Sequence, residues 1–212
     1  MSNARRPPGA AIRDLFGDID IYLFDQLARG RFDARRRVLD AGCGAGRNLR
    51  YLLAHGYDCH GIDRDASAIA QLRREAQALG WEDADARFVA GGAESLPWPD
   101  GAFDAVISSA VLHFADDRPH FERMIAELWR VLAPGGLLFA RLASTIGLDG
   151  YAALAGQRVR LPDGSDRFLV DEAMLVECTA RLGGRLADPL KTTNVQNLRA
   201  MTTWCIVKGD AP

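Results

Sequence analysis

The residues with the clearest capacity for chemistry lie in a glycine-rich segment, residues 38–48, that reads VLDAGCGAGRN. Its apolar start is typical of a buried strand, and its glycines are typical of a tight turn from that strand into a helix. Because glycine has no Cβ, Gly42, Gly44 and Gly46 allow the backbone to turn sharply and to approach a ligand closely. The segment therefore predicts a turn that holds a nucleotide.

The spacing of these glycines argues against two common phosphate-binding turns. A dinucleotide fingerprint has the form G-x-G-x-x-G, whereas Arg47 occupies the place of the third glycine here. The lysine of a Walker turn is absent as well. A NAD-dependent oxidoreductase on a Rossmann sheet stays an alternative, and Arg47 counts against it.

An acid follows the turn at the end of the next expected strand. Asp63 lies 21 residues after Gly42, where a carboxylate can accept hydrogen bonds from both hydroxyls of a ribose. The glycine turn and Asp63 together predict a ligand that contains adenosine. Cys43, inside the turn, is interpreted as a small packing residue, because nothing near it in the sequence would activate a thiol.

From residue 37 onward, short apolar runs alternate with longer segments of helical period, which predicts an α/β fold with a parallel sheet covered on both faces. The expected strands cover residues 38–40, 58–62, 87–89, 103–108 and 137–142, and the expected helices cover residues 47–54, 66–79, 121–132 and 170–182. Pro134, Gly135 and Gly136 are expected to form the turn into the fifth strand. Residues 185–190 and 201–207 are expected to close the chain as an antiparallel pair.

The length of 212 residues favours one domain with additions over two independent cores. Residues 1–11 carry no periodic apolar signal and are expected to form a flexible tail. Residues 12–212 are expected to form the single domain. Within it, residues 12–36 predict an N-terminal helical cap with an amphipathic helix at 20–27, and residues 144–169 predict an insertion on the substrate side of the sheet.

Composition excludes several classes of partner. The formal net charge is −2, from 26 basic and 28 acidic residues, so no nucleic-acid partner is expected. Four scattered cysteines and four histidines complete no zinc pattern, and reduced thiols fit a cytoplasmic location. No apolar run approaches the roughly 18 residues of a membrane helix, so no membrane partner is expected. A monomer or a homodimer is expected.

Residues 37–140 resemble the class I S-adenosylmethionine-dependent methyltransferases. The resemblance begins with the D-x-G-x-G-x-G pattern at 40–46 and the ribose acid Asp63. It continues through three further segments in the expected order, which are ESLPW at 94–98 with DGAFD at 100–104, SSAVLH at 108–113 and VLAPGG at 131–136. No other fold is known to share the whole series.

The resemblance implies a Rossmann-like three-layer sandwich whose seven-stranded, mainly parallel sheet has an antiparallel last strand. It implies that S-adenosylmethionine lies across the carboxyl ends of the first strands. The loop from Gly42 through Cys43 to Gly44 would then face the methionine moiety, Asp63 the ribose and Arg64 the edge of the adenine. Asp40 has two interpretations: it accepts backbone N–H bonds from the turn, or it complements the positive charge of the cofactor.

The sequence departs from the family after the third expected strand, in the segment that would hold adenine. Many members have an acid where this chain has Gly92, and that acid binds the exocyclic amine. Two replacements are open: the Ala93 amide with the Glu94 side chain, or packing alone.

The activity that the resemblance implies is methyl transfer by in-line displacement to a small-molecule acceptor. The Asn-Pro-Pro-aromatic motif of enzymes that methylate nucleic-acid bases or glutamine is missing at residues 108–111. Ser109 and His113 are expected near the transferred methyl, and His113 is either a general base or a wall residue. The insertion at 144–169 and the helix at 20–27 are expected to cover the acceptor pocket as a mobile lid. A cofactor-binding module without catalysis is a further alternative.

Overall fold

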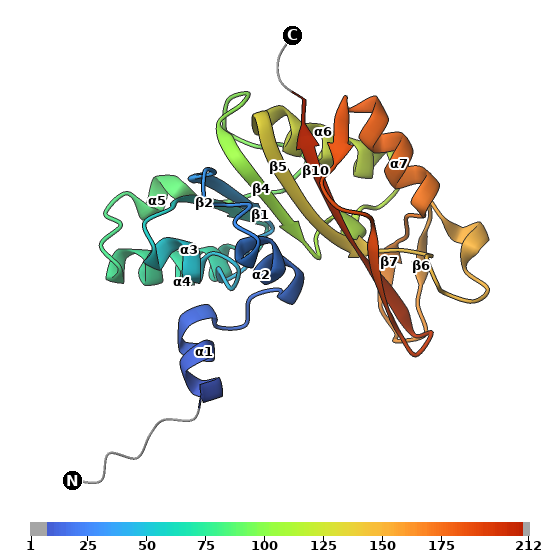
Figure 1. Ribbon diagram of the computed structural model, residues 1–212, viewed down its shortest axis with the longest axis horizontal. Coiled ribbons are helices and arrows are strands. Elements are labelled where there is room, and N and C mark those ends of the chain that lie inside the picture. Colours follow the sequence, from blue (N-terminus) through green and yellow to red (C-terminus); the bar gives the residue numbers. More distant parts are fainter. Residues whose placement is uncertain (1–7, 210–212) are drawn as a thin grey trace.

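One mixed sheet organises the computed structural model, which describes residues 8–209 (Figure 1). Its strands are β1 Arg37–Ala41, β2 Asp58–Asp63, β3 Phe88–Ala90, β4 Phe103–Ser109, β5 Leu132–Ala143, β8 Gly184–Leu186, β9 Lys191–Val195 and β10 Arg199–Lys208. They lie in the order β3-β2-β1-β4-β5-β10-β8, and β9 also pairs with β10. β1 to β5 are parallel, and β10 runs antiparallel to β5.

The predicted fold class is therefore confirmed, including the reversed last strand. β8 pairs with residues 206–208 of β10, and β9 pairs with residues 199–203. Because β5 occupies the other edge of β10, β8 and β9 share one position at the end of the sheet. Eight strands thus fill seven places.

Helices cover both faces of this sheet, as side chains that alternate along the strands require. Leu39, Val106 and Leu138 belong to the hydrophobic cluster under the helices at 118–131 and 172–181, whereas their neighbours Val38 and Ala105 belong to the cluster under the helices at 21–28, 50–54 and 66–78. The helices are α1 Pro8–Phe16, α2 Ile21–Ala28, α3 Arg50–Ala54, α4 Ala66–Ala78, α5 Ala84–Arg87, α6 Arg118–Val131 and α7 Glu172–Arg181, with short 3₁₀ turns at Leu112–Phe114 and Ala152–Leu154.

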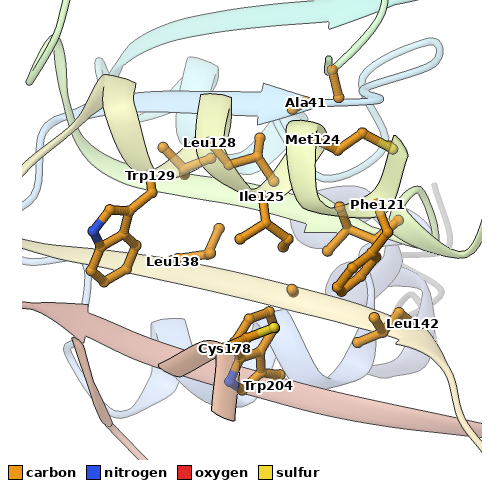
Figure 2. Close-up of a cluster of buried hydrophobic side chains, with 14 of the residues drawn as sticks. Ala41, Phe121, Met124, Ile125, Leu128, Trp129, Leu138, Leu142, Cys178 and Trp204 are labelled. Atoms are coloured by element: carbon orange, nitrogen blue, oxygen red, sulfur yellow. The ribbon is translucent and has the colours of Figure 1, made fainter. Parts of the chain in front are cut away.

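The α6 helix shows how the sequence sets this packing. It begins after Asp117, whose carboxylate accepts the backbone N–H of His120 at 2.7 Å, and it has proline in its first turn. Its apolar residues recur every three or four positions, and Figure 2 shows them packed against the β5 side chains Leu138 and Leu142. These contacts fix the first half of α6 against the sheet, close to the carboxyl end of β4.

Several boundaries differ from the sequence predictions. Helix α1 starts at Pro8, so residues 8–11 are helical where a flexible tail was expected, and residues 1–7 lie outside the described residues. Residues 47–49 form turns before α3 rather than its first residues. Pro134 to Gly136 lie inside β5, which begins at Leu132, because the ladder between β4 and β5 shifts register there instead of ending.

The insertion at 144–169 contains a hairpin of β6 Arg158–Arg160 and β7 Asp166–Phe168. It packs through a small hydrophobic cluster of its own, in which Leu161 and Leu169 join Ala200 of β10. The hairpin is therefore held against the start of β10, at the lower right of Figure 1. The predicted strand at 185–190 is shorter, at 184–186, and β9 follows it where no strand was expected.

Candidate functional site

The glycine turn is attached to the end of β2. The backbone N–H groups of Gly42 and Cys43 both donate to the Ile62 carbonyl, at 2.7 and 3.1 Å. Gly42 has a φ of +87°, and a Cβ on it would lie 2.1 Å from a methyl carbon of Val111. A side chain is excluded here by both backbone strain and space. Gly44 has a φ of +51° and nothing within 4 Å of a Cβ, so the turn presents open backbone there.

Asp63 lies beside this turn, as the sequence predicts. Its carboxylate accepts the N–H of Gly44 at 2.8 Å and the N–H of Asp65 at 2.9 Å. These two bonds fix the carboxylate between the turn after β1 and the helix after β2. Its remaining acceptor capacity faces the space at the carboxyl ends of the strands, because Asp63 lines two cavities there.

The first of these, which we call the first cavity, has a volume of about 380 Å³ and extends from the turn to α6. Its lining residues include the predicted Gly42, Asp63, Arg64, Gly92 and Ala93, together with Gly91, Ala110, Val111, Phe114, Asp116, His120, Met124 and Arg158. The cavity thus brings together the segments that follow β1, β2, β3 and β4 with residues of α6 and of the insertion, at the carboxyl edge of the sheet where open α/β folds bind ligands.

Two further cavities adjoin the first. The third cavity, of about 290 Å³, shares Gly42 and Asp63 with it and adds the charged residues Asp18, Arg47 and Arg50. The second cavity, of about 280 Å³, shares Ala110 and Phe114 with the first and extends under the insertion. The order is therefore third, first, second, with the glycine turn at one junction and the residues after β4 at the other.

Glu94 explains the glycine at position 92. A Cβ on Gly92 would lie 2.3 Å from Oε2 of Glu94, so the Glu94 carboxylate occupies the space that a side chain at 92 would fill. Oε1 of Glu94 accepts a hydrogen bond from Arg64 at 2.8 Å, whereas Oε2 is buried without a hydrogen-bond partner among the described residues. An acid at 92 and this placement of Glu94 exclude each other, because two carboxylates would collide.

Comparison with known proteins agrees with this geometry. A family model described as a methyltransferase domain matches residues 39–140. The chain is 43% identical to a demethylmenaquinone methyltransferase of Thermus thermophilus over 50% of this chain and 46% of that protein. It is 32% identical to a malonyl-[acyl-carrier protein] O-methyltransferase of Enterobacter lignolyticus over 84% of this chain and 66% of that protein. The chain belongs to the class I S-adenosylmethionine-dependent methyltransferases.

Solved structures agree on the fold. The Burkholderia thailandensis 1,6-didemethyltoxoflavin-N1-methyltransferase, solved with S-adenosylhomocysteine, matches with a TM-score of 0.68 and 20% identity, over 95% of this chain and 84% of that one. At this identity the likeness shows the fold alone. This methyltransferase chain spans between about half and two thirds of the length of the curated relatives named above.

The residues present fit the cofactor of this family, S-adenosylmethionine. Asp63 offers carboxylate oxygens for a ribose, and the segment from Gly91 to Ala93 forms a wall with little side chain, against which a flat ring can lie. The arginines of the third cavity can bind a carboxylate, and Asp18 can bind an ammonium group. The charges of this cavity therefore complement those of an amino acid. Asp63, the segment from Gly91 to Ala93 and the third cavity together therefore match a nucleoside joined to an amino acid.

Asp40 is fully buried, and neither of its carboxylate oxygens has a hydrogen-bond partner among the described residues. Burial raises the pKa of this carboxyl to about 7, and both Arg47 and the nearby side-chain amide of Asn48 oppose the rise. The interpretation that Asp40 accepts the N–H groups of the turn is wrong for Gly42 and Cys43, because these donate to Ile62. Asp40 also lines none of the three cavities.

Cys43 is buried inside the turn, and its sulfur would lie 2.8 Å from a Cβ on Gly61. Burial raises the pKa of the thiol far above its usual range. The side chain therefore packs between the turn and β2, while the residue contributes to the third cavity. Among the described residues, no group of three or more His, Cys, Asp or Glu side chains could hold a metal ion.

Ser109 and His113, both expected near the transferred methyl, have different surroundings. Ser109 donates to the carboxylate of Asp20 at 2.8 Å and lines none of the three cavities. His113 lines the second cavity, and its Nδ1 accepts the N–H of Ala143 at 3.2 Å. Burial, together with the charges of Arg167 and Arg141, lowers the pKa of His113 to about 3. The imidazole is therefore neutral at physiological pH.

Sequence reasoning missed the basic residues of the second cavity, which are Arg141, Arg167 and Arg199. Each comes from a different strand, and 24 of the 26 basic residues in the chain are arginine, so no local spacing marks these three. It also missed His120, which lines the first cavity from α6 with Nε2 3.8 Å from the Glu94 carboxylate. That contact depends on the turn before α6, and no motif in the sequence predicts this turn.

Proposed function

We propose that this protein transfers the methyl group of S-adenosylmethionine to a small-molecule acceptor. The observation that carries the proposal is that the first and third cavities share Gly42 and Asp63 in their lining. The first cavity has a wall for a flat ring, and the adjoining third cavity has charged residues for an amino acid. A nicotinamide oxidoreductase fits less well, because Arg47 lines the third cavity where a dinucleotide turn requires glycine.

In this proposal Asp63 holds the ribose hydroxyls, and Gly91, Gly92 and Ala93 form the wall for the adenine. Glu94 takes the role of the acid that many relatives have at position 92, because its Oε2, which makes no hydrogen bond among the described residues, can accept from the exocyclic amine. Arg47 and Arg50 bind the carboxylate of the methionine moiety, and Asp18 binds its ammonium group.

When bound, the cofactor supplies a methyl group on a positively charged sulfonium, which leaves as a neutral thioether and needs no acid. The chain then contributes alignment and exclusion of water. His113 acts as a neutral wall residue, since its Nδ1 already accepts the Ala143 N–H.

The names of the relatives support an acceptor that is a small or carrier-bound metabolite, because one relative is named for demethylmenaquinone and another for a malonyl-[acyl-carrier protein]. No helix among residues 8–209 is long and apolar enough to cross a membrane. All four cysteines are buried and unpaired, which supports the expected reducing, cytoplasmic location.

Calorimetric titration tests the proposal. We expect S-adenosylmethionine and S-adenosylhomocysteine to bind in the micromolar range, and NADH to give no saturable heat. The control is Asp85→Asn, an exposed acid distant from the cavities, which should bind like the wild type. Tight binding of NADH without any response to S-adenosylmethionine would contradict the proposed function.

We also propose that α2 and residues 144–169 form the cover of the acceptor site. Leu161, Asp163, Ser165 and Arg167 of the insertion line the second cavity, and the Tyr22 hydroxyl of α2 bonds to Thr193 at its rim. Hydrogen exchange with and without S-adenosylhomocysteine should show protection that rises on binding. Equal, strong protection in both states would identify a fixed insertion instead.

A further inference from the structure

Three guanidinium groups from three strands meet at the second cavity. They belong to Arg141 of β5, Arg167 of β7 and Arg199 of β10. Among the described residues that line this cavity, Asp163 is the only one with a carboxylate. An arginine-rich chain has many solvated arginines, but convergence from separate strands on one cavity of about 280 Å³ is a different arrangement.

The positive charge of this group is not fully balanced by ion pairs among residues 8–209. Arg141 pairs with Asp20 at 3.2 Å, and Arg199 lies 3.6 Å from the carboxylate of Asp163. Arg167 has no ion pair with another residue of the described chain. Its guanidinium donates to the backbone carbonyl of Asp166 at 2.8 Å and lies 4.8 Å from the centre of the Phe114 ring.

A buried donor is left over as well. Nε of Arg141 is buried and has no hydrogen-bond partner among the described residues. His113 adds no charge, because its imidazole is neutral, but its Nε2 carries the proton when Nδ1 accepts from Ala143. The cavity thus offers one uncompensated positive charge, an arrangement that disfavours an apolar or cationic occupant.

We propose that the second cavity binds the methyl acceptor through an oxyanion, a carboxylate or a phosphate, held by Arg167 together with Arg141 and Arg199. The planar fork of arginine suits such oxygens because it donates two parallel hydrogen bonds. This inference rests on the proposed function, since the second cavity is the acceptor site only if the first one holds the cofactor. Ala110 and Phe114, which line both cavities, would lie between the anion and the cofactor.

The experiment uses the full chain saturated with S-adenosylhomocysteine and follows the Nε–Hε signals of its arginines by NMR. The probes are acetate, inorganic phosphate and the neutral acetamide, each titrated at constant ionic strength against chloride. We expect saturable shifts of the Arg141 and Arg167 signals with acetate, phosphate or both, and none with acetamide. The tighter of acetate and phosphate identifies which oxyanion the site prefers.

Variants show whether the response belongs to this cavity. Arg167→Gln should weaken oxyanion binding by about tenfold or more, because it removes a charge-assisted pair. Arg160→Gln is the matched control, since Arg160 lies on the same hairpin, is exposed and does not line the cavity. If Arg167→Gln does not fold, the exposed Arg199 takes its place as Arg199→Gln.

The inference is overturned if the shifts with acetate and phosphate only match those with chloride, or if Arg160→Gln and Arg167→Gln weaken binding equally. Binding of S-adenosylhomocysteine to the wild type separates this inference from the proposed function. If it persists while the oxyanion response is absent, the proposed function stands and the anionic acceptor is wrong. If it is absent, the proposed function itself fails.

Discussion

Asp40 makes the stability of the protein depend on pH in a way that a single substitution can isolate. The side chain is fully buried without a hydrogen-bond partner among the described residues, and burial raises its pKa to about 7. An aspartate in the unfolded chain has a pKa of about 3.9. Between these two values the folded protein retains a proton that the unfolded chain has released. Stability therefore falls as pH rises through this range.

The size of the effect follows from the difference between the two pKa values. At about 1.4 kcal/mol per pH unit, a rise to about 7 corresponds to a loss of about 4 kcal/mol between pH 4 and pH 7.5. Asp40→Asn removes the titration but keeps the shape of the side chain. The buried amide costs about 1–3 kcal/mol for its unpaired N–H groups, and this cost is the same at every pH.

Urea unfolding of the wild type and Asp40→Asn at several pH values between 4 and 7.5 measures the difference directly. We expect the variant to gain on the wild type by up to about 4 kcal/mol across the range. Asp85→Asn, at an exposed aspartate, should run parallel to the wild type. If the curves of Asp40→Asn and the wild type also run parallel, the Asp40 carboxyl has an ordinary pKa and its burial does not set its titration.

Three further experiments test the site. Asp63→Asn should weaken S-adenosylhomocysteine binding by about 1.5–3 kcal/mol in calorimetry, because an amide replaces the carboxylate that accepts from the ribose. An unchanged affinity would mean that the ribose does not bind at Asp63. His113→Ala should lower stability by about 1–3 kcal/mol, because the Ala143 N–H loses its acceptor, and should leave the pH profile of turnover intact. Gly92→Asp should weaken cofactor binding, and adding Glu94→Ala should restore it with a coupling of about 1–3 kcal/mol in a double-mutant cycle; additive effects would contradict the exchange of roles.

The sequence predicts those parts of the fold for which the spacing of apolar residues, or the need for glycine in a turn, allows a single arrangement. Val38 and Leu39 face opposite layers because they are neighbours on a strand buried on both sides. The placement of Asp63 beside Gly44 follows from the parallel pairing of β1 with β2, which brings both carboxyl ends to one edge. The order of residues along the chain is therefore enough to pair the glycine turn with the ribose acid.

The parts that the sequence misses depend on tertiary contacts. β9 reads KTTNV, with little apolar alternation, and it forms because β10 offers it a free edge. The hairpin β6–β7 has short, polar strands that are stabilised by packing of Leu161 and Leu169 against Ala200. In the same way, the arginines of the second cavity are brought together by the pairing of β5 with β10 and by the packing of the β6–β7 hairpin on β10, and their spacing in the sequence carries no signal.

The sequence predicts where the N-terminal cap lies along the chain, but it does not predict the contacts that Asp20 of this cap makes. At the level of sequence it is the residue before an amphipathic helix, and its carboxylate indeed accepts the N–H of Tyr22 at 2.9 Å. The same carboxylate also accepts from Ser109 of β4 and from Arg141 of β5, at 2.8 and 3.2 Å. The first turn of α2 is thereby held by charge to the two strands beside the second cavity. Opening α2 would leave the buried carboxylate of Asp20 without these donors, a cost of about 1–3 kcal/mol for each lost bond. Motion of the cover should therefore begin in the insertion, which has no such buried ion pair to break among the described residues, and α2 should follow only when Arg141 gains another partner.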